Sequence, residues 1–262
     1  RAINDLPVVA DLPALAALAD QWPQFARLSA GSAEQPTPRD AILRRIVNAN
    51  LRVGTSAAAE RLATLAAAEP LPELVRLEAI AALNHWSKPD GKDHVSGLWR
   101  PLPERPPLKS AKIESTLLAI LTHPASDKIV IALLELAGKD HWTSFGSPAL
   151  ARVGNAQAGP ELRIAALETL SELKSPQLHE AMQVASASTS EALRLAAVKL
   201  TAQSAPDNQV VAMLEKYRTA GTVPEQQAVY AVLARTHDPA ADRLLAQQLD
   251  ELRAGKIAPA VE

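Results

Sequence analysis

Four polar residues near the middle of the chain are of the types that bind metal ions. His85, Asp90, Asp93 and His94 lie within ten consecutive positions, and imidazole and carboxylate groups are common ligands of zinc and related ions. A metal site needs ligands that converge on one point, and this stretch has no His pair at i, i+4 and no other recognised ligand spacing. We therefore interpret His85 as a helix-end residue and His94 as a loop residue, and we expect no metal site.

Other catalytic and cofactor motifs are incomplete. Gly138-Lys139 is followed by Asp140, and Leu133 occupies the position of the first glycine of a P-loop. Ser144 does not lie in the strand-to-helix elbow of a serine hydrolase. The chain has no cysteine, which excludes disulfides, thiolate ligands and covalent haem attachment within it. We expect neither a catalytic residue nor a cofactor site in this segment.

The composition favours closely packed helices. The chain has 262 residues, of which 47% are hydrophobic and only 3% aromatic. Alanine and leucine carry most of the apolar content, which suits helices and not strands. A formal net charge of -2 gives no reason to expect a nucleic-acid partner. No run of apolar residues is long enough to predict a membrane span.

The elements that would position any site are short helices separated by Pro, Gly, Ser and Thr. Capping boxes are predicted at Ser188 with Glu191 and at Thr222 with Glu225, and Thr37 is expected to cap a helix that begins at Pro38. The helix-period apolar pattern predicts helices over 9–20, 38–53, 55–68, 72–86, 109–122, 126–139, 147–156, 160–174, 177–187, 190–203, 207–220, 223–236 and 240–254.

One local pattern recurs at a fixed spacing. Ala166, Ala197 and Ala228 are 31 residues apart, and an upstream copy contains Ala79. The pattern Arg-Ile-Ala-Ala-Leu begins at Arg163. It returns as Arg-Leu-Ala-Ala-Val from Arg194 and, in a weaker form, as Glu-Gln-Gln-Ala-Val from Glu225. A period of this length on helices indicates stacked hairpins in which a small residue lets helices approach closely. We predict an all-α fold, a right-handed α-solenoid of helical hairpins in a single domain over 1–262.

A long irregular segment over 87–108 interrupts the repeats. Five prolines and two glycines prevent a continuous helix there, and loops of this length tend to be functional, packed on themselves or disordered. Because Leu98, Trp99 and Leu102 give the segment apolar surface to bury, we expect an ordered loop folded onto the helices. Its candidate interaction residues are His94, Trp99, Arg100 and Arg105.

Two His-Trp pairs close predicted helices, at His85-Trp86 and His141-Trp142. One interpretation is a shared recognition surface. The other is that each indole covers the end of a hairpin and finds a carbonyl for its N–H.

The repeats resemble HEAT-type helical repeats over nearly the whole chain. A narrower likeness starts at Leu74-Val75-Arg76-Leu77-Glu78-Ala79, continues with His85-Trp86-Ser87-Lys88-Pro89 and Asp93, and ends with Gly97-Leu98-Trp99-Arg100-Pro101-Leu102-Pro103. This succession is similar to the HEAT segment of large secreted redox proteins of the Planctomycetes and Verrucomicrobia group. In them a sugar-dehydrogenase-like propeller precedes the repeats, and a c-type cytochrome domain often follows. The resemblance implies a periplasmic or extracellular location, and it implies that this chain is a fragment of a larger protein. It carries over no catalytic or haem-binding residue.

Two classes of function follow as expectations. The first is a non-catalytic scaffold, expected to be a monomer, that spaces domains or binds protein domains in cis or in trans. The alternative is a HEAT-like enzyme such as a chromophore lyase or a nucleic-acid base-processing enzyme. A nucleic-acid enzyme should line one face with Lys, Arg and aromatic residues, whereas here the basic residues are scattered and balanced by acids.

Overall fold

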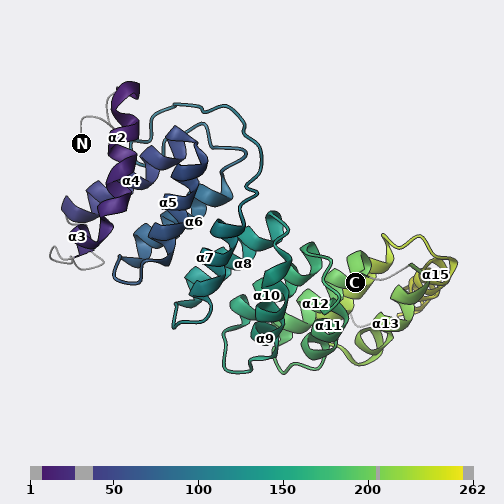
Figure 1. Ribbon diagram of the computed structural model, residues 1–262. Helices are drawn as coiled ribbons and strands as arrows, with labels where there is room; N and C mark the ends of the chain where they lie inside the picture. The colour runs from purple at the N-terminus through teal and green to yellow at the C-terminus, as the bar shows by residue number, and fades with distance from the viewer. Residues whose placement is uncertain (1–7, 27–37, 205–206, 256–262) are drawn as a thin grey trace. The chain divides into compact units, whose positions relative to one another are not determined.

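The computed structural model describes residues 8–26, 38–204 and 207–255, and in these ranges it is all-α (Figure 1). The described residues form no β-strand, and they contain one isolated antiparallel bridge between Lys92 and Trp99. The chain divides into two compact units, 1–144 and 145–262, each of which is considered by itself below. None of the helices in the described part of the chain has the length and apolar character needed to cross a bilayer.

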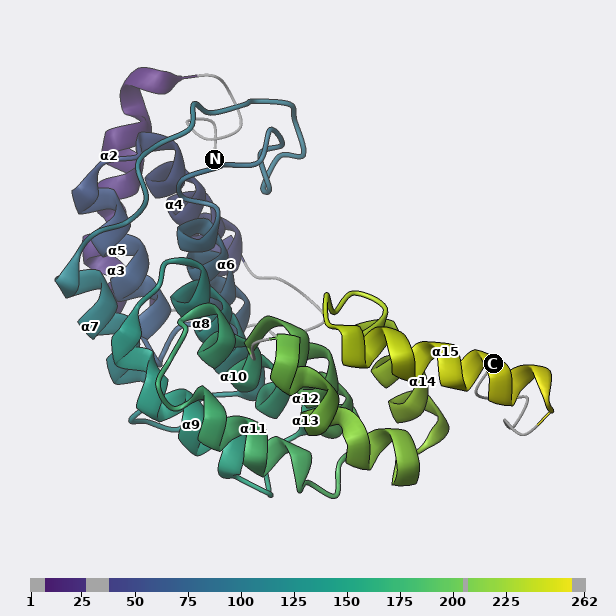
Figure 2. The same ribbon diagram turned by 90° about the vertical axis from the view of Figure 1, so that its right-hand side faces the viewer.

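In the first unit, each long helix packs against the next helix or the next but one. Thus α4 contacts α2, α5 and α6, while α6 contacts α8 and α5 contacts α7 (Figures 1 and 2). The α-helices of this unit are α2 (Leu12–Ala17), α3 (Trp22–Ala26), α4 (Pro38–Val53), α5 (Ser56–Ala67), α6 (Glu73–Asn84), α7 (Ala111–Ile120) and α8 (Asp127–Lys139).

The second unit has the same kind of packing. In it α10 contacts α12, which contacts α14, while α9 contacts α11 and α13 contacts α15. The α-helices of this unit are α9 (Gly146–Gly154), α10 (Pro160–Glu172), α11 (Leu178–Ser186), α12 (Glu191–Ser204), α13 (Asp207–Ala220), α14 (Val223–Leu233) and α15 (Pro239–Arg253).

Most predicted helices are confirmed to within two or three residues, with two exceptions near the start. The stretch 9–20 is not one α-helix, because α2 is flanked by the 3-10 turns Val9–Asp11 and Leu18–Gln21. A short helix, α3, also begins at Trp22 within the segment expected to be irregular. Pro13 and Pro23 lack an N–H and fit only the first turn of a helix, which limits this region to short helical pieces.

The capping predictions have mixed outcomes. The capping box of Thr222 with Glu225 is confirmed at the start of α14. The box at Ser188 is wrong, because α12 begins at Glu191 and Ser190 accepts the hydrogen bond from the backbone N–H of Leu193. Ser188 instead accepts from the backbone N–H of Ser190 and from Arg163. Thr37 lies outside the described residues, although α4 does begin at Pro38.

The repeated motif has a structural role at both its alanine and its arginine. Ala79 and Ala166 are fully buried, as a small residue at a helix crossing should be. The arginine three residues earlier reaches back to the end of the preceding helix: Arg76 Nε donates to the Ala66 carbonyl (2.8 Å) and Arg163 Nε to the Val153 carbonyl (2.9 Å). A cation at a helix C-terminus satisfies a carbonyl that has no partner in the helix and complements the helix dipole.

In the second unit the 31-residue period is also a spacing of direct contacts. Arg194 Nε donates to Glu225 Oε1 (2.5 Å), and Thr222 Oγ1 donates to Glu191 Oε1 (2.6 Å). In both pairs the partners are 31 residues apart, which is one repeat. Equivalent positions of successive repeats are therefore neighbours.

Replacing Ala166 with leucine tests this packing. Ala166 has no exposed surface, so the added carbons have to displace neighbouring side chains, and we expect a loss of about 1–3 kcal/mol in the free energy of unfolding. Ala151, which is exposed on α9, provides the control, because Ala151→Leu should change stability by less than about 0.5 kcal/mol. Urea denaturation of the two variants makes the comparison, and equal stabilities would mean that Ala166 is not at a tight crossing.

Candidate functional site

The Pro-rich segment contains a short antiparallel hairpin over residues 91–100. The backbone N–H of Asp93 donates to the Leu98 carbonyl (2.9 Å), and that of Arg100 donates to the Gly91 carbonyl (2.8 Å). At the turn, the N–H of Gly97 donates to the Asp93 carbonyl (2.7 Å). Gly97 has a φ of 70°, in the left-handed region that glycine enters without strain. The segment is therefore ordered, as predicted.

Asp93 anchors this hairpin to the helices. Its side chain is fully buried, and its Oδ1 accepts hydrogen bonds from the backbone N–H groups of Val95 (3.0 Å) and Ser96 (2.8 Å), which fixes the turn. Its Oδ2 accepts from Asn48 Nδ2 of α4 at 2.8 Å. Arg52 of α4 and Arg100 of the hairpin place Nη1 atoms 3.7 and 4.0 Å from the same oxygen. Asp93, Asn48, Arg52 and Arg100 form what we call the Asp93 anchor.

These contacts determine the ionisation of Asp93. Burial disfavours the carboxylate and on its own would raise the pKa. The hydrogen bonds from Ser96, Asn48 and Val95 outweigh burial and hold the pKa of Asp93 below its ordinary value. The anchor is therefore built around a charged carboxylate.

The expected burial of three apolar residues of the segment 87–108 is wrong for two of them. Trp99 is 72% exposed and Leu98 is 50% exposed, while Leu102 is half-buried. One part of the Trp99 ring lies against Gly91, where there is no room for a side chain. A buried carboxylate holds the loop in place, while Leu98 and Trp99 remain at the surface.

Arg105 makes a second attachment of the segment. Its guanidinium lies 4.4 Å from the centre of the Trp86 ring, and its backbone N–H donates to the Ser87 carbonyl (2.9 Å). Burial lowers the pKa of Arg105, and its two Nη atoms have no hydrogen-bond partner among the described residues. Trp86 and Trp142 are each only 5% exposed, which supports the packing interpretation of the His-Trp pairs over a recognition surface.

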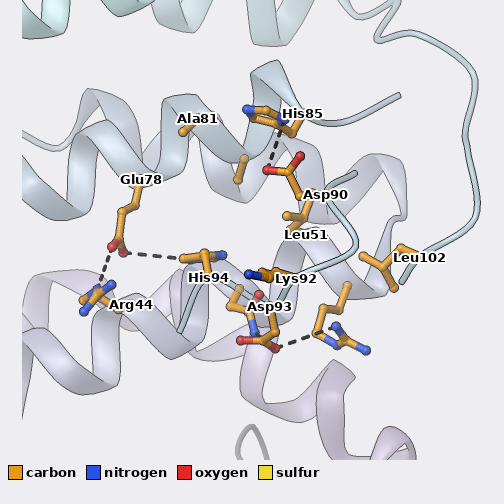
Figure 3. Close-up of a pocket in the computed structure, with 13 residues that line it drawn as sticks. Arg44, Leu51, Glu78, Ala81, His85, Asp90, Lys92, Asp93, His94 and Leu102 are labelled. Carbon is orange, nitrogen blue, oxygen red and sulfur yellow. Dashed lines mark hydrogen bonds and ion pairs between the residues drawn. The ribbon is translucent and has the colours of Figure 1, made fainter. Parts of the chain in front are cut away.

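A cavity of about 320 Å³ lies between α4, α6 and the Pro-rich segment 87–108 (Figure 3). It holds most of the polar residues discussed so far. The lining residues are Arg44, Asn48, Leu51 and Arg52 from α4, Glu78, Ala81, Ala82 and His85 from α6 and its end, and Asp90, Lys92, Asp93, His94 and Leu102 from the segment.

The charged groups of the cavity are mostly arranged in pairs. Arg44 Nε donates to Glu78 Oε1 (2.6 Å), and His94 Nε2 is 4.0 Å from Glu78 Oε2 (Figure 3). His85 Nδ1 lies 3.6 Å from Asp90 Oδ2. Burial lowers the pKa of His94; Glu78 and Asp93 oppose that change and Arg44 adds to it. The neutral imidazole of His94 is thus favoured in the fold.

The residues first considered as metal ligands do not converge. His85 pairs with Asp90, His94 lies near Glu78, and Asp93 is occupied by its anchor. Within the described ranges, no three His, Asp or Glu residues are grouped so that they could hold a metal ion.

The four candidate interaction residues have different positions. His94 lines the cavity, Arg100 belongs to the Asp93 anchor, Trp99 is exposed on the hairpin, and Arg105 is stacked on Trp86. Asn48, Arg44 and Glu78 could not be found from local sequence patterns, because they lie on helices that contact the loop only in the folded chain. The turn at Asp93 does have a local sequence pattern. An aspartate whose side chain can accept from the backbone N–H two residues later, followed by a glycine, is typical of an Asx-type turn.

A comparison with models of known protein families finds no match, and no curated protein matches the sequence.

Proposed function

We propose that this chain is a non-catalytic helical-repeat scaffold, a right-handed solenoid of HEAT-like hairpins, which binds a protein domain through the hairpin at 91–100. In this proposal it spaces or orients domains within a larger extracytoplasmic electron-transfer protein, and its partner is a domain joined to it or a separate protein. The 31-residue contacts in the second unit and the equivalent arginines Arg76 and Arg163 support the repeat architecture.

One observation carries the binding role. Trp99 and Leu98 are large apolar residues that remain exposed on a hairpin which a buried charge network holds in place. Exposed tryptophans on an ordered support are typical of the residues that dominate protein interfaces, because they bury a large area on binding at little cost in conformational entropy. An ordered hairpin also avoids the cost of ordering a flexible loop on binding.

Trp99→Ala tests the proposed interface. The wild-type chain is titrated with the purified domains encoded on either side of it in the parent gene, and affinities are measured by calorimetry. If Trp99 anchors the interface, the variant should bind about thirtyfold or more weakly, as for loss of a residue worth about 2 kcal/mol. Leu74→Ala is the control, because Leu74 is another exposed apolar residue, with 52% of its surface accessible, but it lies on α6 outside the hairpin. Equal affinities of wild type and Trp99→Ala would refute this interface.

A further inference from the structure

Both methionines of the chain line a second cavity, which lies within the second unit. Met182 belongs to α11 and Met213 to α13, and the sequence contains no other methionine. The cavity has a volume of about 350 Å³. Met182 is 5% exposed and packs in the core, whereas Met213 is 37% exposed. Core packing alone therefore does not account for Met213.

The repeat places the two methionines at equivalent positions of neighbouring helices. They are 31 residues apart, which is the spacing of the direct contacts between successive repeats. One turn further along the same two helices, Tyr217 Oη donates to the Ser186 carbonyl (3.4 Å), and this pair is also 31 residues apart. The axes of packed helices are about 8–10 Å apart. Two long, flexible methionine side chains can span such a gap with an ion bonded to both.

A histidine supplies a third ligand from the same face of α11. His179 lines the cavity and precedes Met182 by three residues, so the two side chains are neighbours on the helix surface. His179 Nε2 lies 3.0 Å from Gln183 Nε2. When the Gln183 amide is turned to present Oε1, it accepts from Nε2–H, and the lone pair of Nδ1 is left for a metal. A hydrogen bond on the second ring nitrogen is typical of metal-bound histidines.

The ligands of this cavity select for a soft metal ion of low charge. Thioether sulfur prefers copper(I), whereas Mg²⁺ and Ca²⁺ prefer oxygen. The described residues that line the cavity include no carboxylate, and Lys174 adds a positive charge, which repels a divalent ion more than a monovalent one. Thioether sulfur is also a different kind of ligand from the His, Asp and Glu groups, for which the described residues show no metal cluster.

We propose that this cavity is a copper(I) site, in which the sulfur atoms of Met182 and Met213 and the imidazole of His179 hold the ion in three-fold coordination. An ion bound between α11 and α13 joins two successive repeats, so binding should also stabilise the second unit against unfolding. The site is separate from the hairpin at 91–100 and does not depend on the interface proposed there.

The two methionines provide a direct readout of binding. In the full chain labelled with ¹³C-methyl methionine, the methyl spectrum contains one signal from Met182 and one from Met213. Copper(I) is added under anaerobic conditions from its bicinchoninate complex, whose colour reports how much of the ion is transferred. We expect both methyl signals to shift together and to saturate at one ion per chain. Zinc(II) should shift neither signal, because it prefers imidazole, carboxylate and thiolate ligands.

Three variants connect binding to the cavity. Met182→Leu and Met213→Leu remove the sulfur and nearly preserve the apolar volume, and His179→Gln removes the imidazole. Each should weaken copper(I) binding at least about tenfold, because loss of a residue that merely supports a metal ligand already costs about 10–100-fold. His123→Gln is the control, because His123 is an exposed histidine of the first unit, and this change should leave binding unaltered.

Circular dichroism verifies that the variants are folded before they are compared. The proposal is overturned if copper(I) shifts neither methyl signal or only one of them. It is also overturned if both leucine variants bind copper(I) as tightly as wild type, or if zinc(II) displaces the bound copper(I).

Discussion

Replacing Asp93 with alanine is expected to lower the free energy of unfolding by about 3–5 kcal/mol, as for removal of one partner from a buried ion pair. The carboxylate fixes the turn through Val95 and Ser96 and joins the hairpin to α4 through Asn48. Without it, Arg52 and Arg100 face each other across the vacated position with no charge between them. The hairpin should separate from the helices, and hydrogen exchange at Asp93, Gly97 and Arg100 amides should become faster.

Asp90 offers a matched control within the same loop. Its side chain is 72% exposed, and its ion pair with the imidazole of His85 spans 3.6 Å. Asp90→Ala should therefore change the free energy of unfolding by less than about 0.5 kcal/mol. Urea denaturation of both variants makes the comparison. Similar losses for Asp90→Ala and Asp93→Ala would show that the loop responds to its overall charge and not to a buried anchor.

The pH dependence of the Asp93 effect has a definite sign. The pKa of Asp93 in the fold is below its ordinary value of 3.8, so the unfolded chain binds a proton at higher pH than the folded chain does. The stabilisation by this carboxylate is therefore complete above about pH 4 and is lost as the pH falls through the lowered pKa. Accordingly, the difference in stability between wild type and Asp93→Ala should be constant from pH 5 to 7 and shrink below pH 3.8.

The helices could be predicted from the sequence because their signals are local. Apolar periodicity, Pro-initiated first turns and cap residues specify α4, α10 and α14 within the sequence of each helix itself. Of the recurring alanines, Ala79, Ala166 and Ala197 are buried as predicted, whereas Ala228 is only partly buried. The same local signals fail where short 3-10 turns compete with an α-helix, as around α2.

The site could not be predicted in the same way, because its contacts are distant in sequence. Asn48 and Asp93 are 45 residues apart, and Arg44 and Glu78 are 34 apart. An apolar residue in a loop was expected to bury itself, yet a charged residue forms the anchor and Trp99 stays exposed. Nothing local to Asp93 indicates which helix it would contact. The repeat period does contain one long-range signal. Glu225 occupies the position at which the preceding copy has Arg194, and these two residues form an ion pair.

That pair, Arg194 with Glu225, leads to the second large effect. Glu225 is 2% exposed, and its Oε1 accepts from Arg194 Nε at 2.5 Å while its Oε2 accepts from the backbone N–H of Thr222 at 2.7 Å. Arg194→Met leaves a buried carboxylate without its cation, and we expect the free energy of unfolding to fall by about 3–5 kcal/mol. Arg253→Met is the control, because its ion pair with Asp250 is exposed on both sides and such pairs contribute about 0–1 kcal/mol.

Two further measurements separate the ion pair from a general loss of packing. Burial opposes ionisation of Glu225, but the hydrogen bonds from Thr222 and Arg194 lower its pKa below the ordinary 4.5. Its stabilisation is therefore present above about pH 4.5 and is lost as the pH falls, and Arg194→Met should weaken that dependence. The double variant Arg194→Met with Glu225→Met removes both charges and should recover most of the lost stability, because well-packed apolar residues replace buried ion pairs at little cost. If the double variant loses as much stability as the two single variants together, the two side chains act independently and the 31-residue contact does not stabilise the second unit.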